Sequence, residues 1–88
     1  MYIILVYDIN RRRVSKVMKI CKKYLHHVQN SVFEGNLTIA QEEKLKNQLR
    51  RVIKPSEDSI CIYRLNSLKY VRKEEIGKCK IIEDIIEK

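Results

Sequence analysis

A chain of 88 residues with 44% hydrophobic residues, two glycines and one proline excludes a low-complexity segment and predicts one compact domain with short turns. A domain this small buries only about two-thirds of the surface that its unfolded chain exposes, so we expect a partner, most simply a second copy, to cover more. The formal net charge of +8, from 19 Lys and Arg against 11 Asp and Glu, favours nucleic acid as a partner, although a merely basic protein has the same total.

The first predicted elements are a buried strand and an amphipathic helix. Residues 2–7 are rich in β-branched and aromatic side chains, which is typical of a strand buried on both faces. Asn10 is a good N-cap for a helix that extends to about Leu25. The helical side chains that fall on one face, and that we expect to meet the sheet, are Val14, Val17, Met18, Cys21 and Leu25.

The opposite face of this helix carries positive charge only. No acidic residue falls between Asp8 and Glu34, although a solvated helix usually mixes signs and so gains ion pairs between neighbouring turns. Over about 16 Å of helix, this pattern favours a phosphate-facing surface over a merely solvated one. The basic residues are Arg12, Lys16, Lys19 and Lys23, at steps of four, three and four, with Arg11, Arg13 and Lys22 beside them.

The rest of the chain predicts a hairpin or bent strand, a second helix and two further strands. Residues 27–35 are β structure, either as one bent strand or as a tight hairpin that turns near Asn30. Residues 38–41 form a capping box, and Pro55 ends the helix that follows. Residues 59–65 are a clear strand, and residues 69–76 are a weaker edge strand. The predicted buried stripe of the second helix is Leu45, Leu49, Val52 and Ile53.

This order of elements predicts an α+β, ferredoxin-like βαββαβ domain over residues 1–77. Its antiparallel sheet has both helices on one face, so the open face predicts a homodimer. Residues 78–88 are a C-terminal extension, in which a strand at residues 82–87 exchanged between protomers is plausible.

Several chemistries are excluded by missing motifs. The two glycines are too far apart for a phosphate-binding loop, and there is no HExxH, CxxC or nucleophile elbow. Three cysteines without a close pair indicate reduced thiols in a cytoplasm, and no segment approaches membrane-spanning length. We do not expect the adjacent His26 and His27 to be ligands or a catalytic base.

Asp8 is the one carboxylate that attracts attention. It ends the most apolar strand and is followed closely by three arginines. It either caps a strand-to-helix turn or is a ligand for Mg²⁺, which takes one or two protein carboxylates and keeps most of its waters. A two-fold axis that brought both copies of Asp8 together would supply two carboxylates.

Two motifs resemble a known family. Residues 6–9 (Val-Tyr-Asp-Ile) and residues 29–35 (Gln-Asn-Ser-Val-Phe-Glu-Gly) are similar to the smaller of the two core CRISPR spacer-acquisition proteins. That family is often described as CRISPR-associated endonucleases or endoribonucleases. The likeness extends from Met1 to about Gly77, and the two motifs at this separation in a short chain are specific.

The resemblance implies a ferredoxin-like homodimer whose sheets face one another, with Asp8 as the Mg²⁺ ligand and catalytic residue of each protomer. It also implies cleavage of single-stranded RNA or double-stranded DNA, and a dimer that bridges integrase subunits during spacer acquisition. The residues that we expect to contact phosphates, on the strength of the basic face, are Arg11, Arg12, Arg13, Lys16 and Lys19.

Two functions are therefore weighed. A Mg²⁺-dependent endonuclease needs the Asp8 carboxylates and nearby arginines, but the sequence shows no second acid and no convincing base. A structural, DNA-bridging subunit needs only the basic surface and the dimer, and physical reasoning favours it in the cell. A stand-alone toxin-type endoribonuclease on the same fold is a more distant alternative.

Overall fold

The computed structural model describes residues 1–65, so the expected edge strand at 69–76 and the C-terminal extension at 78–88 lie outside the described residues. The described chain forms six elements in the predicted order, which confirms the ferredoxin-like α+β fold. They are β1 (Tyr2–Asp8), α1 (Arg11–Tyr24), β2 (His26–Gln29), β3 (Val32–Asn36), α2 (Ile39–Val52) and β4 (Ser59–Leu65).

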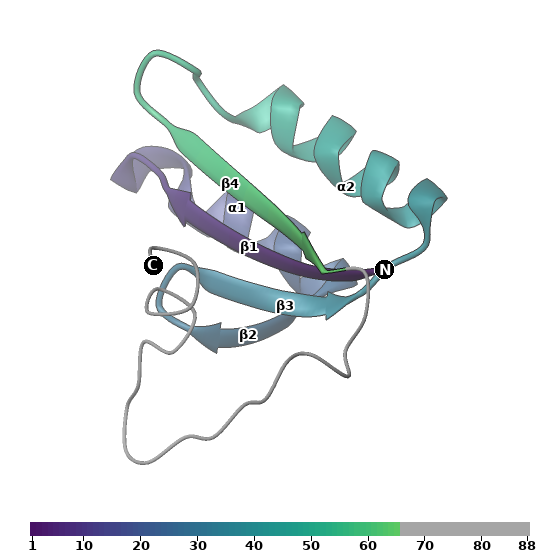
Figure 1. The fold of residues 1–88 in the computed structure, drawn as a ribbon. Helices are drawn as coiled ribbons and strands as arrows, with labels where there is room; N and C mark the ends of the chain where they lie inside the picture. The colour runs from purple at the N-terminus through teal and green to yellow at the C-terminus, as the bar shows by residue number, and fades with distance from the viewer. Residues whose placement is uncertain (66–88) are drawn as a thin grey trace.

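The four strands form one antiparallel sheet in the order β2-β3-β1-β4. Figure 1 shows β1 in the middle of the sheet, with the β2–β3 hairpin on one side and β4 on the other. Because β4 runs antiparallel to β1, the start of β4 lies beside the end of β1, and Asp8 is opposite Ser59. The loops before α1 and before β4 therefore meet at one end of the sheet.

Alternation along β1 separates two faces of the sheet. Ile3, Leu5 and Tyr7 belong to the core, where side chains from both α1 and α2 pack against them. Both helices therefore cover the same face, as predicted. Tyr2, Ile4, Val6 and Asp8 alternate with these residues and so lie on the other face, which we call the helix-free face.

Within residues 1–65, the buried core comes from β1, α1, β3, α2 and two connecting residues, and β4 adds partly buried side chains. Leu45 of α2 and Phe33 of β3 are fully buried, and the Phe33 ring lies 6.0 Å from the Tyr7 ring between centroids. On α1, the predicted stripe missed Ile20, which is 9% exposed, while Val14 and Met18 are only partly buried. The helix therefore meets the sheet along a line that is rotated slightly from the predicted one.

The segment after α1 is a hairpin, which settles the choice that the sequence left open. Asn30 turns the chain with a positive φ of 33°, a conformation that asparagine tolerates better than most residues. Gly35 permits a close approach in β3, because a Cβ there would lie 3.1 Å from the Leu25 Cδ2 atom. The end of α1 can therefore pack directly against the hairpin.

Helix α2 begins and ends as the sequence predicts. Thr38 accepts a hydrogen bond from the Gln41 backbone N–H (3.1 Å), and the Gln41 side chain accepts one from the Thr38 N–H (2.9 Å). Val52 is the last helical residue, three positions before Pro55. Within residues 1–65, no helix is long and apolar enough to cross a membrane.

Candidate functional site

Asp8 is exposed at the last position of β1. Its neighbours across the sheet place it on the helix-free face, where Val6 precedes it on the same side and Ser59 lies opposite. Within residues 1–65, no group of three or more His, Cys, Asp or Glu side chains is arranged to hold a metal ion. Mg²⁺ takes one or two protein carboxylates, so a second copy of the chain would add a further carboxylate ligand if its Asp8 lay close by.

The exposed charges of α1 are all positive. Its first turn contains no acidic residue, and all Lys and Arg side chains of the helix except Arg13 are exposed. In the described part of the chain, Arg13 is the one α1 residue that forms ion pairs. The exposed basic residues of α1 are Arg11, Arg12, Lys16, Lys19, Lys22 and Lys23. Four of the five predicted phosphate contacts therefore lie on a surface that solvent reaches.

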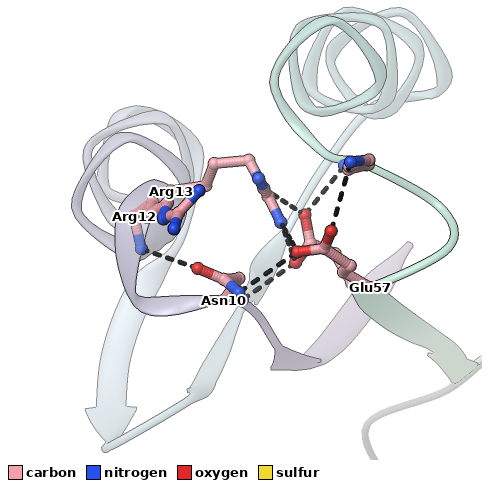
Figure 2. Close-up of polar contacts among 6 residues, drawn as sticks. Asn10, Arg12, Arg13 and Glu57 are labelled. Atoms are coloured by element: carbon pink, nitrogen blue, oxygen red, sulfur yellow. Dashed lines mark hydrogen bonds and ion pairs between the residues drawn. The ribbon is translucent and has the colours of Figure 1, made fainter.

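Arg13 differs from the other predicted phosphate contacts. Its Nε donates to Asp58 Oδ2 at 2.6 Å, and its Nη2 donates to Asp58 Oδ1 at 3.1 Å and to Glu57 Oε1 at 3.0 Å. Its side chain is 19% exposed. The guanidinium thus faces the loop before β4 instead of facing outward with Arg12, as Figure 2 shows.

Asp58 is the centre of this network. Its side chain has no exposed surface (0%), and its carboxylate also accepts hydrogen bonds from the backbone N–H groups of Asn10 and Lys54, both at 2.8 Å. Hydrogen bonding from Arg13 holds the pKa of Asp58 well below its usual range, in spite of burial, which acts the other way. The same pairing raises the pKa of Arg13. Asp58 is therefore a fixed anion that joins two loops.

Asn10 and Glu57 complete the network in Figure 2. The Asn10 side-chain oxygen accepts from the Arg12 N–H at 3.0 Å, which confirms Asn10 as the N-cap of α1. Its Nδ2 donates to Glu57 Oε1 at 3.1 Å. Hydrogen bonding from Arg13 first, and then from Lys54, lowers the pKa of Glu57.

More positive charge lies at the same end of the molecule. The Asn10–Asp58 and Lys54–Asp58 hydrogen bonds bring the end of α2 beside the start of α1. Arg50 and Arg51 are exposed in the last turn of α2, where they also complement the helix dipole. The end of α2 therefore brings two further exposed arginines to the Asp8 end of the molecule.

Sequence reasoning missed this network, although one signal was present. Glu57 and Asp58 are adjacent acids directly before the last described strand. In the predicted fold, the last strand pairs antiparallel with the first, which brings its start beside Asp8 and the three arginines. Acids at that point were therefore positioned to meet one of those arginines.

Fold and site together define a class: a small ferredoxin-like domain with an exposed carboxylate at the end of its first strand and a basic first helix. A family model described as "CRISPR associated protein Cas2" matches residues 1–73. The chain therefore belongs to the Cas2 family, which confirms the resemblance found in the sequence.

Relatives and solved structures agree with this assignment. Two relatives named "CRISPR-associated endoribonuclease Cas2" come from Thermotoga maritima, 48% identical over 88% of each chain, and from Thermococcus kodakarensis, 47% identical over 98% of this chain and 100% of the relative. A crystal structure of a Cas2 protein has a TM-score of 0.80 at 44% identity and covers 91% of this chain and 90% of its own. Streptococcus pyogenes Cas2 has a TM-score of 0.72 at 35% identity and covers 85% and 100%.

Proposed function

We propose that the protein is a CRISPR adaptation nuclease: a basic homodimer that binds nucleic acid and cleaves a phosphodiester with Mg²⁺ held by Asp8. The observation that carries the proposal is the position of Asp8. It stands exposed at the end of the central strand, on the helix-free face, directly before a helix whose exposed charges are all positive. Membership of a family whose relatives are named endoribonucleases supports a nuclease.

The helix-free face supports the homodimer. It carries apolar side chains from three strands, of which Val6, Tyr63 and Leu65 are half-buried and Ile4 and Val32 are buried within one chain. A second copy packed on this face would remove that surface from water, which is the main favourable term in association. A two-fold axis near the end of β1 would then bring both Asp8 carboxylates together. The apolar residues of this face are Ile4, Val6, Val32, Tyr63 and Leu65.

The donor chemistry of paired Asp8 carboxylates fits Mg²⁺. It is a hard cation that takes oxygen ligands and is often bound by one or two protein carboxylates. When bound, Mg²⁺ supplies a more acidic water and neutralises charge on a phosphate. The chain's own residues hold the cation through Asp8 and bring phosphate to it through Arg11 and Arg12, which follow within four positions.

The basic surface supports binding to duplex DNA or single-stranded RNA. Duplex DNA presents about one phosphate per 1.7 Å of axis, so the exposed Lys and Arg side chains of α1 can contact several phosphates at once. Such contacts are independent of base sequence and weaken steeply as salt rises. This behaviour suits a protein that captures fragments of any sequence and, as a dimer, bridges integrase subunits.

A second function, a purely structural DNA-bridging subunit, is favoured by one observation. Within residues 1–65, no group of three or more His, Cys, Asp or Glu side chains surrounds Asp8, whereas a hydrolase site usually offers several such groups. In that function Asp8 only ends β1, and the dimer holds DNA without cutting it. A stand-alone toxin-type endoribonuclease is the third candidate, and membership of the Cas2 family speaks against it.

The test compares wild-type protein with Asp8→Asn, and with Glu43→Gln as a matched loss of one exposed carboxylate on α2. Binding and cleavage of duplex DNA and single-stranded RNA are measured with Mg²⁺ and with chelator. We expect Asp8→Asn to lose at least about 100-fold in cleavage and to keep binding, because a metal ligand is removed but no phosphate contact. Equal cleavage by Asp8→Asn contradicts the proposal, and binding without cleavage by wild-type protein favours the structural subunit.

A further inference from the structure

We propose that Asp58 and Arg13 are positioning residues for the strand-end carboxylate Asp8 and for the first turn of α1. The inference rests on the function proposed above, because it gives these side chains a role in the same site. Three observations carry it: Asp58 is fully buried, it accepts hydrogen bonds from two loops, and the residue after it pairs with Asp8.

Asp58 fixes the backbone that follows Asp8 in the chain. Asp8 itself is held by pairing with Ser59, the neighbour of Asp58 in the chain. Two residues after Asp8, the Asn10 N–H donates to Asp58 Oδ1 at 2.8 Å. Only Ile9 therefore lies between Asp8, which is fixed by Ser59, and Asn10, which is fixed by Asp58. The direction of the backbone as it leaves β1 after Asp8 thus depends on Asp58.

Arg13 neutralises Asp58 and is held by it. The guanidinium donates from two nitrogens to the two carboxylate oxygens, at 2.6 and 3.1 Å, in the paired geometry that makes such bonds strong. If Arg13 turned outward to a phosphate, Asp58 would be left as a buried anion without its cation, which is strongly unfavourable. Arg13 therefore acts inside the protein, whereas Arg11 and Arg12 are exposed.

The same network sets the start of α1. The Asn10 side chain accepts from the Arg12 N–H at 3.0 Å and donates to Glu57 at 3.1 Å, and Glu57 is itself bound to Arg13. The backbone of Arg12 is thus placed relative to Asp8 through side chains from the loop before β4. In metal sites, the removal of a residue that holds a metal ligand in place, without touching the metal, commonly lowers metal affinity or activity by about 10–100-fold.

The first test compares Asp58→Asn with Glu42→Gln in the full-length protein, at a temperature where both are folded. Each change removes the charge of a carboxylate paired with an arginine, but Glu42 binds Arg64, which lies opposite Ile3 at the far end of β1 from Asp8. Thermal unfolding measures the stability of each variant. A Mg²⁺ titration followed by NMR at the Asp8 amide, and hydrogen exchange at the Asn10 amide, measure positioning.

We expect Asp58→Asn to weaken Mg²⁺ binding about 10-fold or more and to speed exchange at Asn10. Glu42→Gln should leave the Mg²⁺ affinity within about twofold even where it lowers stability, because distant sites act independently. Unchanged Mg²⁺ affinity in Asp58→Asn, or an equal loss in both variants, overturns the inference.

A second test separates the two neighbouring arginines without using the metal. Arg12→Gln and Arg13→Gln each remove one charge from the first turn of α1, and duplex DNA affinity is measured across a range of salt. Arg12→Gln should lower the slope of log affinity against log salt by about 0.9, while Arg13→Gln leaves it unchanged. Equal slopes for the two variants overturn the inference.

The two proposals fail in different ways. If wild-type protein binds no Mg²⁺ and does not cleave, the proposed role of Asp8 fails. Asn10 exchange and the salt slopes then decide the positioning inference by themselves. Unchanged exchange in Asp58→Asn, or a loss of slope in Arg13→Gln equal to that in Arg12→Gln, overturns it.

Discussion

A carboxylate paired with an arginine lies beside each end of β1, but the two pairs have different structural roles. At the Asp8 end, Asp58 belongs to the loop between α2 and β4, has no exposed side-chain surface and also accepts two backbone N–H groups. At the other end, Glu42 lies within α2 and binds Arg64 of β4, whose side chain is 44% exposed.

The difference shows where this fold needs side chains to hold its backbone. Helix and strand hydrogen bonds already fix Glu42 and Arg64, so their pair only adds a contact between α2 and β4. The loop before β4 has only a local turn, in which the Lys54 carbonyl accepts from the Glu57 and Asp58 N–H groups, and the Asp58 side chain joins this loop to the one before α1. The exposed carboxylate Asp8 lies at the end where the backbone is fixed by side chains.

The largest effect that we expect is on thermal stability, when the carboxylate of each pair is removed in turn. Asp58→Ala leaves Arg13 with Glu57 as its acceptor and leaves two backbone N–H groups without theirs, whereas Glu42→Ala leaves only partly exposed cations. The fall in melting temperature should be several degrees for Glu42→Ala and roughly twice as large for Asp58→Ala. Thermal unfolding by circular dichroism measures both, and an equal fall contradicts the distinction between the two ends.

Acid unfolding should show the same order. The pKa of Asp58 is lowered in the folded protein, so its contribution to stability is present above the unfolded pKa of about 4 and is lost as pH falls below that value. Asp58→Asn should therefore flatten the acid limb of the stability curve. Glu42→Gln should flatten it less. Denaturant unfolding between neutral pH and pH about 2 tests this, and parallel wild-type and Asp58→Asn curves would contradict it.

Nucleic-acid binding sharpens the comparison further. Arg51 is exposed at the Asp8 end of α2, while Lys44 is exposed nearer the other end. If the basic surface extends from α1 onto the end of α2, Arg51→Ala lowers the salt slope of duplex binding by up to about 0.9 and Lys44→Ala leaves it unchanged. A Lys44→Ala variant with the lower slope would place the surface elsewhere.

Cysteine labelling gives the smallest effect and compares the two faces of the sheet. Burial raises the pKa of Cys21 to about 12, so its thiol should not react at neutral pH. Cys61 is exposed opposite Val6 on the helix-free face. Peptide mapping after alkylation should find Cys61 labelled at high dilution and protected at concentrations where the homodimer forms. Labelling of Cys61 that does not change with concentration contradicts a dimer through this face.

Most of the fold follows from local patterns in the sequence. Asn10 and the Thr38–Gln41 capping box mark helix starts through short-range hydrogen bonds, and these are the positions where the prediction and the structure agree. The hairpin at Asn30 stayed open because a bent strand and a tight turn share the same residues. Ile20 was missed because the predicted stripe shares Val17 and Cys21 with the buried one but is rotated slightly toward Val14 and Met18.

The candidate site was predicted in part. A sequence pattern reveals the position of Asp8 at a strand end and the exposed Lys and Arg side chains of α1, because both depend on residues nearby in the chain. The partner of Arg13 is Asp58, which is 45 residues away in the chain and reaches Arg13 only once β4 pairs with β1. Arg11, Arg12 and Arg13 look alike in sequence, and long-range pairing alone distinguishes the third from the first two.

The most direct test of the central claim is the number of Mg²⁺ ions bound per chain, measured by titration calorimetry on the wild-type dimer and on Asp8→Asn. A site that needs the carboxylates of two copies predicts about one Mg²⁺ for every two chains, lost in Asp8→Asn and kept in Glu43→Gln. One Mg²⁺ per chain, or binding that persists in Asp8→Asn, would contradict an Asp8 site shared across a two-fold axis.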